Sequence, residues 1–152
     1  MIIFGLDPAT HCGWAVFKDG DPVACGTWTL GRVGWEVGAR IEALALELDQ
    51  LRLACGPPEY LFYEQCFGAR RSAELQHGLI GYIRYWCSRL CVPCEGLNGS
   101  SVKLSFAGSG KASKDTMLAE ARRRWPHLDI PDDNAADALA VGVTGLERMN
   151  NA

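Results

Sequence analysis

The feature that most constrains the fold is a change in hydrophobic period after the first thirty residues. Residues 2–6 form a short apolar run, and residues 13–18 and 23–30 are rich in the aromatic and β-branched side chains of strands. An Asp-Gly pair between the last two runs is typical of a tight hairpin. From about residue 33 to 54, apolar side chains recur instead at helical spacing. An antiparallel strand meander followed by a helix predicts a mixed α/β sheet.

Strands and helices then alternate to the end of the sequence. The remaining predicted elements are a strand at 60–64, a helix at 71–90, a short strand at 91–95, and helices at 100–106, 113–124 and 132–149. The expected N-caps of the last three helices are Ser100, Ser113 and either Asp132 or Asp133. A chain of 152 residues is long enough for one domain with its own core. We therefore expect a single α/β domain over residues 1–152, with a five-stranded mixed sheet flanked by helices.

The net charge of −3 and the pI near 5.6 argue at first against a protein that binds nucleic acid. The charges are unevenly distributed, however. Residues 1–64 hold four basic and nine acidic side chains, whereas residues 65–152 hold eleven and nine. Within the second half, segments 70–89 and 102–124 carry local charges of +3 and +4. Because a polyanion responds to the field of a patch, these segments are candidates for DNA contact, although solvated helix faces would give the same counts.

The cysteines and the amino terminus bear on the cellular compartment. Seven cysteines without a secretory signal argue against a disulfide framework. Cys87, Cys91 and Cys94 have the spacing of radical enzymes that hold an iron–sulfur cluster, but such enzymes are larger, and buried free cysteine is the commoner case. The amino terminus lacks the basic flank of a signal peptide, and no apolar stretch is long enough to span a membrane. We expect a cytoplasmic protein.

Acidic side chains close two of the predicted strands. Asp7 follows the first apolar run and Glu64 ends the fourth, and functional groups gather at strand ends in open α/β sheets. The first turns of the last helix offer Asp133, Asn134 and Asp137, which can share a face. Clustered carboxylates repel one another unless a cation neutralises them, and oxygen ligands of this kind suit Mg²⁺ or Mn²⁺. Helix capping and two unrelated strand-end acids would explain the same residues without a metal.

Four short motifs follow one another along the chain. They are Phe4-Gly5-Leu6-Asp7-Pro8 with Gly13-Trp14-Ala15-Val16, then Glu64-Gln65-Cys66-Phe67, then Val102-Lys103 through Lys111-Ala112-Ser113-Lys114, and finally Ala135-Ala136-Asp137-Ala138-Leu139-Ala140. Each motif is short, but the ordered set covers nearly the whole chain. In this order and spacing the sequence resembles the RuvC-type Holliday junction resolvases, which are members of the RNase H-like nuclease superfamily.

The resemblance implies an RNase H-like fold and an endonuclease that resolves four-way DNA junctions by paired hydrolytic cuts, leaving 5′-phosphate and 3′-hydroxyl ends. It also implies two Mg²⁺ ions per active site, for which Mn²⁺ would substitute. Asp7 would bridge the ions, while Glu64 and Asp137 would each complete one coordination sphere. Where the family often has an acid or a histidine, this chain has Asn134, a neutral oxygen donor that cannot act as a base. We favour Asn134 over Asp133 as the fourth ligand.

The resemblance further implies how DNA would be held. Phe67 would stack on an opened base at the junction centre, although burial under the second helix is an alternative for this side chain. The expected phosphate contacts are Arg70, Arg71, Lys103, Lys111 and Lys114. Two symmetric cuts need two active sites, which implies a homodimer. The helix at 71–90 is a candidate interface, although core packing would also explain its apolar stripe.

Other functions are compatible with parts of this pattern. A related nuclease that cuts flaps, forks or structured RNA would carry the same motifs, and a junction-binding protein without cleavage is compatible with Asn134. Sugar kinases and actin-like ATPases share the core but need a second lobe, for which 152 residues leave no room. A phosphate-binding loop is excluded because positions 105 and 112 hold Ser and Ala instead of Gly and Ser or Thr. A helicase partner is left open, and an acidic chain of this length is compatible with a phage-encoded member as well as a bacterial one.

Overall fold

The computed structural model describes residues 1–67 and 73–152 and contains one five-stranded sheet. The strand order is β3-β2-β1-β4-β5. The antiparallel meander β1–β2–β3 forms one half, and β4 and β5 extend the sheet parallel to β1. The strands are β1 (Ile2–Asp7), β2 (His11–Lys18), β3 (Asp21–Thr29), β4 (Tyr60–Gln65) and β5 (Cys94–Asn98). The prediction of a five-stranded mixed sheet is confirmed.

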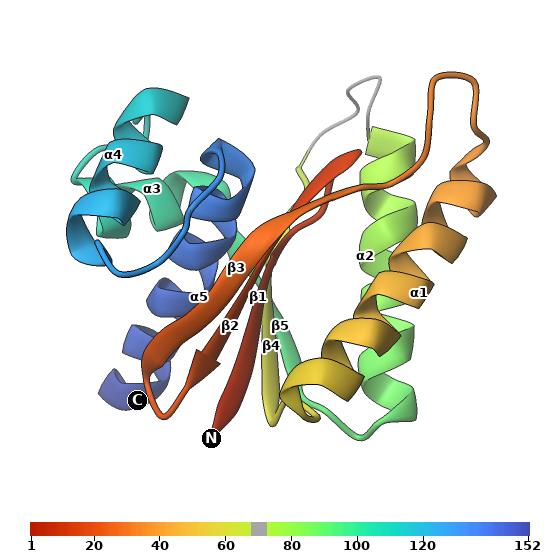
Figure 1. Cartoon of the computed structure of the whole chain (residues 1–152), viewed down its shortest axis with the longest axis horizontal. Coiled ribbons are helices and arrows are strands. Elements are labelled where there is room, and N and C mark those ends of the chain that lie inside the picture. Colours follow the sequence, from red (N-terminus) through yellow and green to blue (C-terminus); the bar gives the residue numbers. More distant parts are fainter. Residues whose placement is uncertain (68–72) are drawn as a thin grey trace.

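Helices cover both faces of the sheet, as Figure 1 shows. One layer holds α1 and α2, and the other holds α3, α4 and α5. The helices are α1 (Val37–Cys55), α2 (Ala73–Arg89), α3 (Gly99–Ala107), α4 (Lys114–Arg124) and α5 (Asp133–Asn151). Each layer has its own apolar core against the sheet, centred on Phe4 and Leu44 on one side and on Phe17 and Leu139 on the other. In the described part of the chain, none of the helices combines the length and apolar character needed to cross a membrane.

The helix α5 lies unusually close to β1 and β2 because small residues face each other there. A Cβ atom added at Gly5 would lie 2.5 Å from the carbonyl oxygen of Ala138, and one added at Gly13 would overlap the carbonyl of Asn134. The buried face of α5 is rich in small residues, which include four alanines and two glycines. The amino-terminal turns of α5 are therefore fixed directly above the ends of β1 and β2.

The fifth strand begins three residues later than the sequence predicted, at Cys94 instead of residue 91. The reason is the way α2 ends. Cys91 adopts a left-handed conformation (φ 55°), and the N–H groups of Cys91 and Val92 donate to the carbonyls of Ser88 and Cys87. This is a Schellman-type helix end, normally built on glycine, so a cysteine at this position gave no signal in the sequence.

Two helix starts also differ from the prediction. The helix α1 begins at Val37 instead of about residue 33, because Gly34 has a positive φ of 86° and the N–H of Trp35 donates to the carbonyl of Arg32 in a turn. The N-cap of α3 is Asn98 and not Ser100. The Asn98 side chain accepts a hydrogen bond from the N–H of Ser101, so Ser100 already lies inside the helix. The Ser113 cap of α4 is confirmed.

Candidate active site

Asp7 and Glu64 stand next to each other at one edge of the sheet. Asp7 is the last residue of β1, and Glu64 is the last but one of β4. The two strands are parallel, with Leu6 paired to Tyr63, so the residues that follow in each strand are also neighbours. The prediction that the first and fourth strands bring these carboxylates together is confirmed.

The amino terminus of α5 is held over the same edge. The Asp132 side chain caps the helix by accepting from the N–H of Ala135 at 3.0 Å, and it also accepts a hydrogen bond of 2.6 Å from the Thr27 hydroxyl of β3. Of the two predicted caps, Asp132 is therefore the correct one. This leaves Asp133 to face the ammonium group of Lys114 at 3.7 Å, and Asp137 follows one helical turn later.

Asp7, Glu64 and Asp137 lie near enough for charge on one to affect another. Burial raises the pKa of Asp7 well above its usual value, and the charges of Glu64 and Asp137 raise it further. Burial, followed by the charges of Glu64 and Asp133, raises the pKa of Asp137 to about 6. Burial likewise raises the pKa of Glu64. All three groups are thus costly to ionise without a positive partner.

The donor set suits a hard divalent cation. Oδ1 of Asp137 is buried, and no described residue forms a hydrogen bond with it. Carboxylate oxygens are the ligands that Mg²⁺ and Mn²⁺ prefer. A bound cation would give the buried Oδ1 of Asp137 a partner and would offset the repulsion among the carboxylates. Within residues 1–67 and 73–152, however, no three His, Cys, Asp or Glu side chains already stand close enough to hold an ion. Binding would therefore require the carboxylates to draw together.

A polar pocket of about 400 Å³ opens beside Glu64, between the ends of β4 and β5 and the start of α3. It is lined by Glu64, Gln65, Phe67, Asn98, Gly99, Ser100 and Lys103. A Cβ at Gly99 would lie 2.6 Å from Oε1 of Glu64, so the glycine leaves room for the Glu64 carboxylate to rest against the first turn of α3. Lys103, one turn later, lowers the pKa values that burial has raised in Asp7, Glu64 and Asp137. Its charge thus acts on the acidic cluster as well as on anything that enters the pocket.

The other side chains predicted to contact DNA differ in their position relative to the acidic cluster. Phe67 is 65% exposed and lines the pocket beside Glu64, so the alternative of burial under α2 is wrong. Lys111 and Lys114 are exposed in the loop before α4 and at its start. Arg70 and Arg71 lie outside the described residues.

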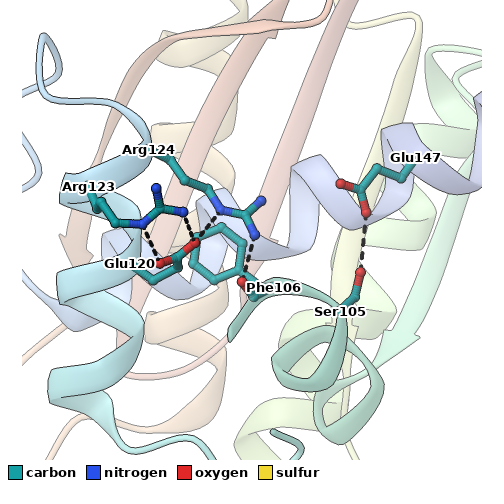
Figure 2. Close-up of polar contacts among 6 residues, drawn as sticks. All are labelled: Ser105, Phe106, Glu120, Arg123, Arg124 and Glu147. Carbon is teal, nitrogen blue, oxygen red and sulfur yellow. Dashed lines mark hydrogen bonds and ion pairs between the residues drawn. The ribbon is translucent and has the colours of Figure 1, made fainter. Parts of the chain in front are cut away.

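The arginines at the end of α4 serve the structure, as Figure 2 shows. The Arg124 guanidinium lies 4.3 Å from the ring centroid of Phe106, donates to the Phe106 carbonyl at 2.7 Å and pairs with Glu120. Arg123 pairs with the same carboxylate, and Arg122 donates to the carbonyl of Ile130. Arg122 and Arg124 thus join α4 to the following loop and to α3, whereas Arg123 forms an ion pair within α4.

A second, smaller pocket of about 240 Å³ lies on the other side of the acidic cluster, at the turn between β1 and β2. It is lined by Ala9, Thr10, His11, Leu75, Gln76 and Asn134. Of these residues, only Asn134 was predicted from the sequence to belong to the site. They come from three segments far apart in the chain, and no local motif marks them.

Comparisons with known proteins identify the relatives of this chain. No family model matches the chain. The crossover junction endodeoxyribonuclease RuvC of Synechococcus sp. (strain CC9902) is 34% identical, over 95% of this chain and 97% of its own length. The RuvC of Prochlorococcus marinus (strain MIT 9303) is 33% identical over the same shares. Among solved structures, T. thermophilus RuvC in complex with a Holliday junction substrate superimposes with a TM-score of 0.79 at 20% identity, over all of this chain and 98% of that one.

The likeness to the solved structure shows the shared RuvC-type fold, and the identity over nearly the full length of both sequences shows the family. A bacterial or phage origin stays a prediction. The chain belongs to the RuvC family of crossover junction endodeoxyribonucleases.

Proposed function

We propose that this chain resolves four-way DNA junctions by metal-dependent hydrolysis of two phosphodiester bonds. The observation that carries the proposal is the grouping of Asp7, Glu64 and Asp137 at one edge of the sheet, where burial raises the pKa of all three and neighbouring carboxylates further raise the pKa of Asp7 and Asp137. Isolated surface acids would not show such shifts, and catalytic groups often do. The family membership supplies the class of substrate.

Asp7, Glu64 and Asp137 would hold the metal ions, with Asn134 as a neutral fourth donor. Two bound Mg²⁺ ions, or Mn²⁺ in their place, supply a Lewis acid for the attacking water and for the leaving 3′ oxygen. The 5′-phosphate and 3′-hydroxyl products would be ready for ligation. Asp133 is the weaker candidate for the fourth position because its carboxylate already faces Lys114 at 3.7 Å.

The residues around the acids would bind and orient the DNA. Lys103 reaches the acidic cluster from α3 and would offset the charge that a phosphate brings into the site. Lys111 and Lys114 are exposed, Lys114 lies 3.7 Å from Asp133, and both lysines would contact flanking phosphates. Phe67 projects into solvent beside Glu64 and would stack on an unpaired base, a contact worth about 1–3 kcal/mol.

Two symmetric cuts would need two copies of this site, so we propose a homodimer. Tyr85 on α2 is 58% exposed, and Leu90, the residue after the helix, is 38% exposed. A stable interface would cover such side chains. Measurement of molar mass in solution tests this point independently of cleavage.

The decisive experiment compares four substrates under the same conditions with Mg²⁺, with Mn²⁺ and with a chelator. These are a synthetic four-way junction, a flap, a fork and a structured RNA. We expect paired nicks in the junction that depend on the metal, and loss of cleavage in Asp7→Asn. The control is Asp115→Asn, which removes the same charge from an exposed position on α4.

Each alternative has its own outcome. Equal cutting of flaps, forks or RNA would indicate a broader nuclease. Tight junction binding without cutting in either metal would indicate a binding protein, for which Asn134 is the specific observation. Cleavage by Asp7→Asn at the rate of the control would refute the role of the carboxylates.

A further inference from the structure

The pocket at the turn between β1 and β2 has a composition unlike that of the pocket beside Glu64. Its polar side chains are Thr10, His11, Gln76 and Asn134, and none of the described residues that line it is an acid, a lysine or an arginine. Ala9 and Leu75 supply the apolar part of the wall. A phosphate or a metal ion would find no formal charge among these groups, whereas a flat, neutral heterocycle would find apolar contacts and several hydrogen-bonding partners.

Hydrogen-bonding contacts from residues outside the pocket help to hold the His11 and Gln76 side chains in place. The Thr29 hydroxyl lies 3.4 Å from Nδ1 of His11, which leaves Nε2 of the ring unengaged by that contact. The Cys66 thiol donates to Oε1 of Gln76 at 3.1 Å, so the amide keeps its Nε2 hydrogens available. Such fixed side chains need little reorganisation when they bind a ligand.

The position of the pocket relates it to the proposed cleavage site. Ala9 is two residues beyond Asp7, and Asn134 is three residues before Asp137 on the same helix. The pocket beside Glu64 lies at the β4–β5 side of the acidic cluster, and this one lies at the β1–β2 side. A strand whose phosphate lies at the carboxylates would therefore bring an adjoining nucleotide to the mouth of this pocket.

The size also fits. Pockets for drug-sized ligands range from roughly 300 to 1,000 Å³. At about 240 Å³ this pocket is smaller and suits a single base. To enter the pocket, the base must be unstacked and turned out of the DNA helix, as happens in enzymes that act on single bases. Side-chain amides read base edges by pairing with their donors and acceptors, and imidazole and hydroxyl groups can add to this pattern.

We propose that this pocket receives one unpaired nucleobase next to the scissile phosphate, and that His11 and Gln76 read its edge and thereby bias where the junction is cut. The inference rests on the proposed function for its substrate. It adds a determinant of cleavage sequence that uses residues outside the four motifs.

The test uses the full-length protein and a set of four-way junctions that differ only in the bases flanking the cut. Wild-type protein should prefer one base at one flanking position by roughly 5- to 150-fold in cleavage rate, the range expected for a read base. His11→Ala and Gln76→Leu should each lower that preference while still cutting the disfavoured junctions. The matched controls are His127→Ala and Gln50→Leu, at exposed positions away from the site, and they should keep the wild-type preference.

A loss of rate that is equal for all bases would indicate a merely structural effect and would overturn the proposal. So would an unchanged preference in both pocket variants, or a wild-type protein without any preference.

A second measurement does not depend on cleavage. Junctions carrying the fluorescent base 2-aminopurine at each flanking position are bound in Ca²⁺, and the emission is recorded for wild type and for His11→Ala. We expect one position at which wild type changes the emission and His11→Ala does not. If the protein binds but never cuts, the proposed function fails while this measurement still decides the pocket. The absence of any such position, or of junction binding, would overturn the inference.

Discussion

The carboxylates at the sheet edge should lower the stability of the metal-free protein, and Asp137→Asn should therefore raise it. Burial, followed by the charge of Glu64 and the other neighbours, raises the pKa of Asp137 to about 6 from the usual 3.8. Each pH unit of difference between the folded and unfolded pKa corresponds to about 1.36 kcal/mol. Ionised Asp137 thus costs the folded state at most about 3 kcal/mol above pH 6. The isosteric amide removes this cost.

The direction of the pH dependence follows from the raised pKa. In the folded protein Asp137 takes up a proton near pH 6, whereas in the unfolded chain it does so only near pH 4. The cost is therefore present in full at pH 7.5, shrinks mainly as the pH falls from about 6 to about 4, and is absent near pH 3. The advantage of Asp137→Asn over wild type should follow the same course.

The assay is thermal unfolding in a chelator at pH 7.5 and at pH 5. For a chain of this length, about 3 kcal/mol corresponds to a rise in Tm of roughly 6–12 °C at pH 7.5, and the gain should be about half as large at pH 5. The control is Asp115→Asn, which removes an acid from the exposed first turn of α4 and should lower the Tm slightly. The reasoning would be refuted if the Tm of Asp137→Asn were at or below that of wild type at pH 7.5 and the difference in Tm between the two proteins were no smaller at pH 5.

Three further outcomes are expected. In wild type, Mg²⁺ should raise the Tm at pH 7.5 in a concentration-dependent way, and Asp137→Asn should show a smaller rise; equal rises would place the metal elsewhere. Calorimetry should give a loss of about 2 kcal/mol for Arg124→Ala, which leaves the Phe106 carbonyl without its charged donor, but a clearly smaller loss for the exposed Arg123→Ala. Gly13→Ala should cost about 2–3 kcal/mol because α5 must move away from β2. Gly38→Ala, where no described residue lies within 4 Å of the new methyl group, should be neutral or stabilising; similar losses in both variants would contradict the close approach of α5.

The parts of the fold that the sequence predicted correctly are those with local causes. The apolar runs and the change of period located the strands, and the Ser113 cap located the start of α4. The fifth strand was misplaced because Cys91 takes a left-handed conformation that usually calls for glycine. The Asn98 cap was missed because a serine two residues later offered an equally good local signal.

The site residues, too, were predictable from the sequence only where the cause is local. Asp7 and Glu64 could be paired in advance because strand-end acids on parallel strands share one edge of the sheet. The roles of the basic residues could not be separated by counting charge, since Arg124 looks like Lys103 in a sequence but is bound to Phe106 and Glu120. The pocket at His11 depends on three segments that meet only in the folded chain.

The net charge of −3 is compatible with DNA cleavage because it is a sum over separate surfaces. The exposed acids Glu42 and Asp49 lie on α1, in the helix layer opposite α3 and α4, which carry Lys103 and Lys114. A polyanion is attracted by a local field, so the acids of α1 hinder its approach to the other face only weakly. The carboxylates at the sheet edge are the exception, because without a cation they would repel the phosphate that the lysines attract. Binding of the scissile phosphate should therefore depend on the metal, whereas binding of the flanking phosphates should depend mainly on salt.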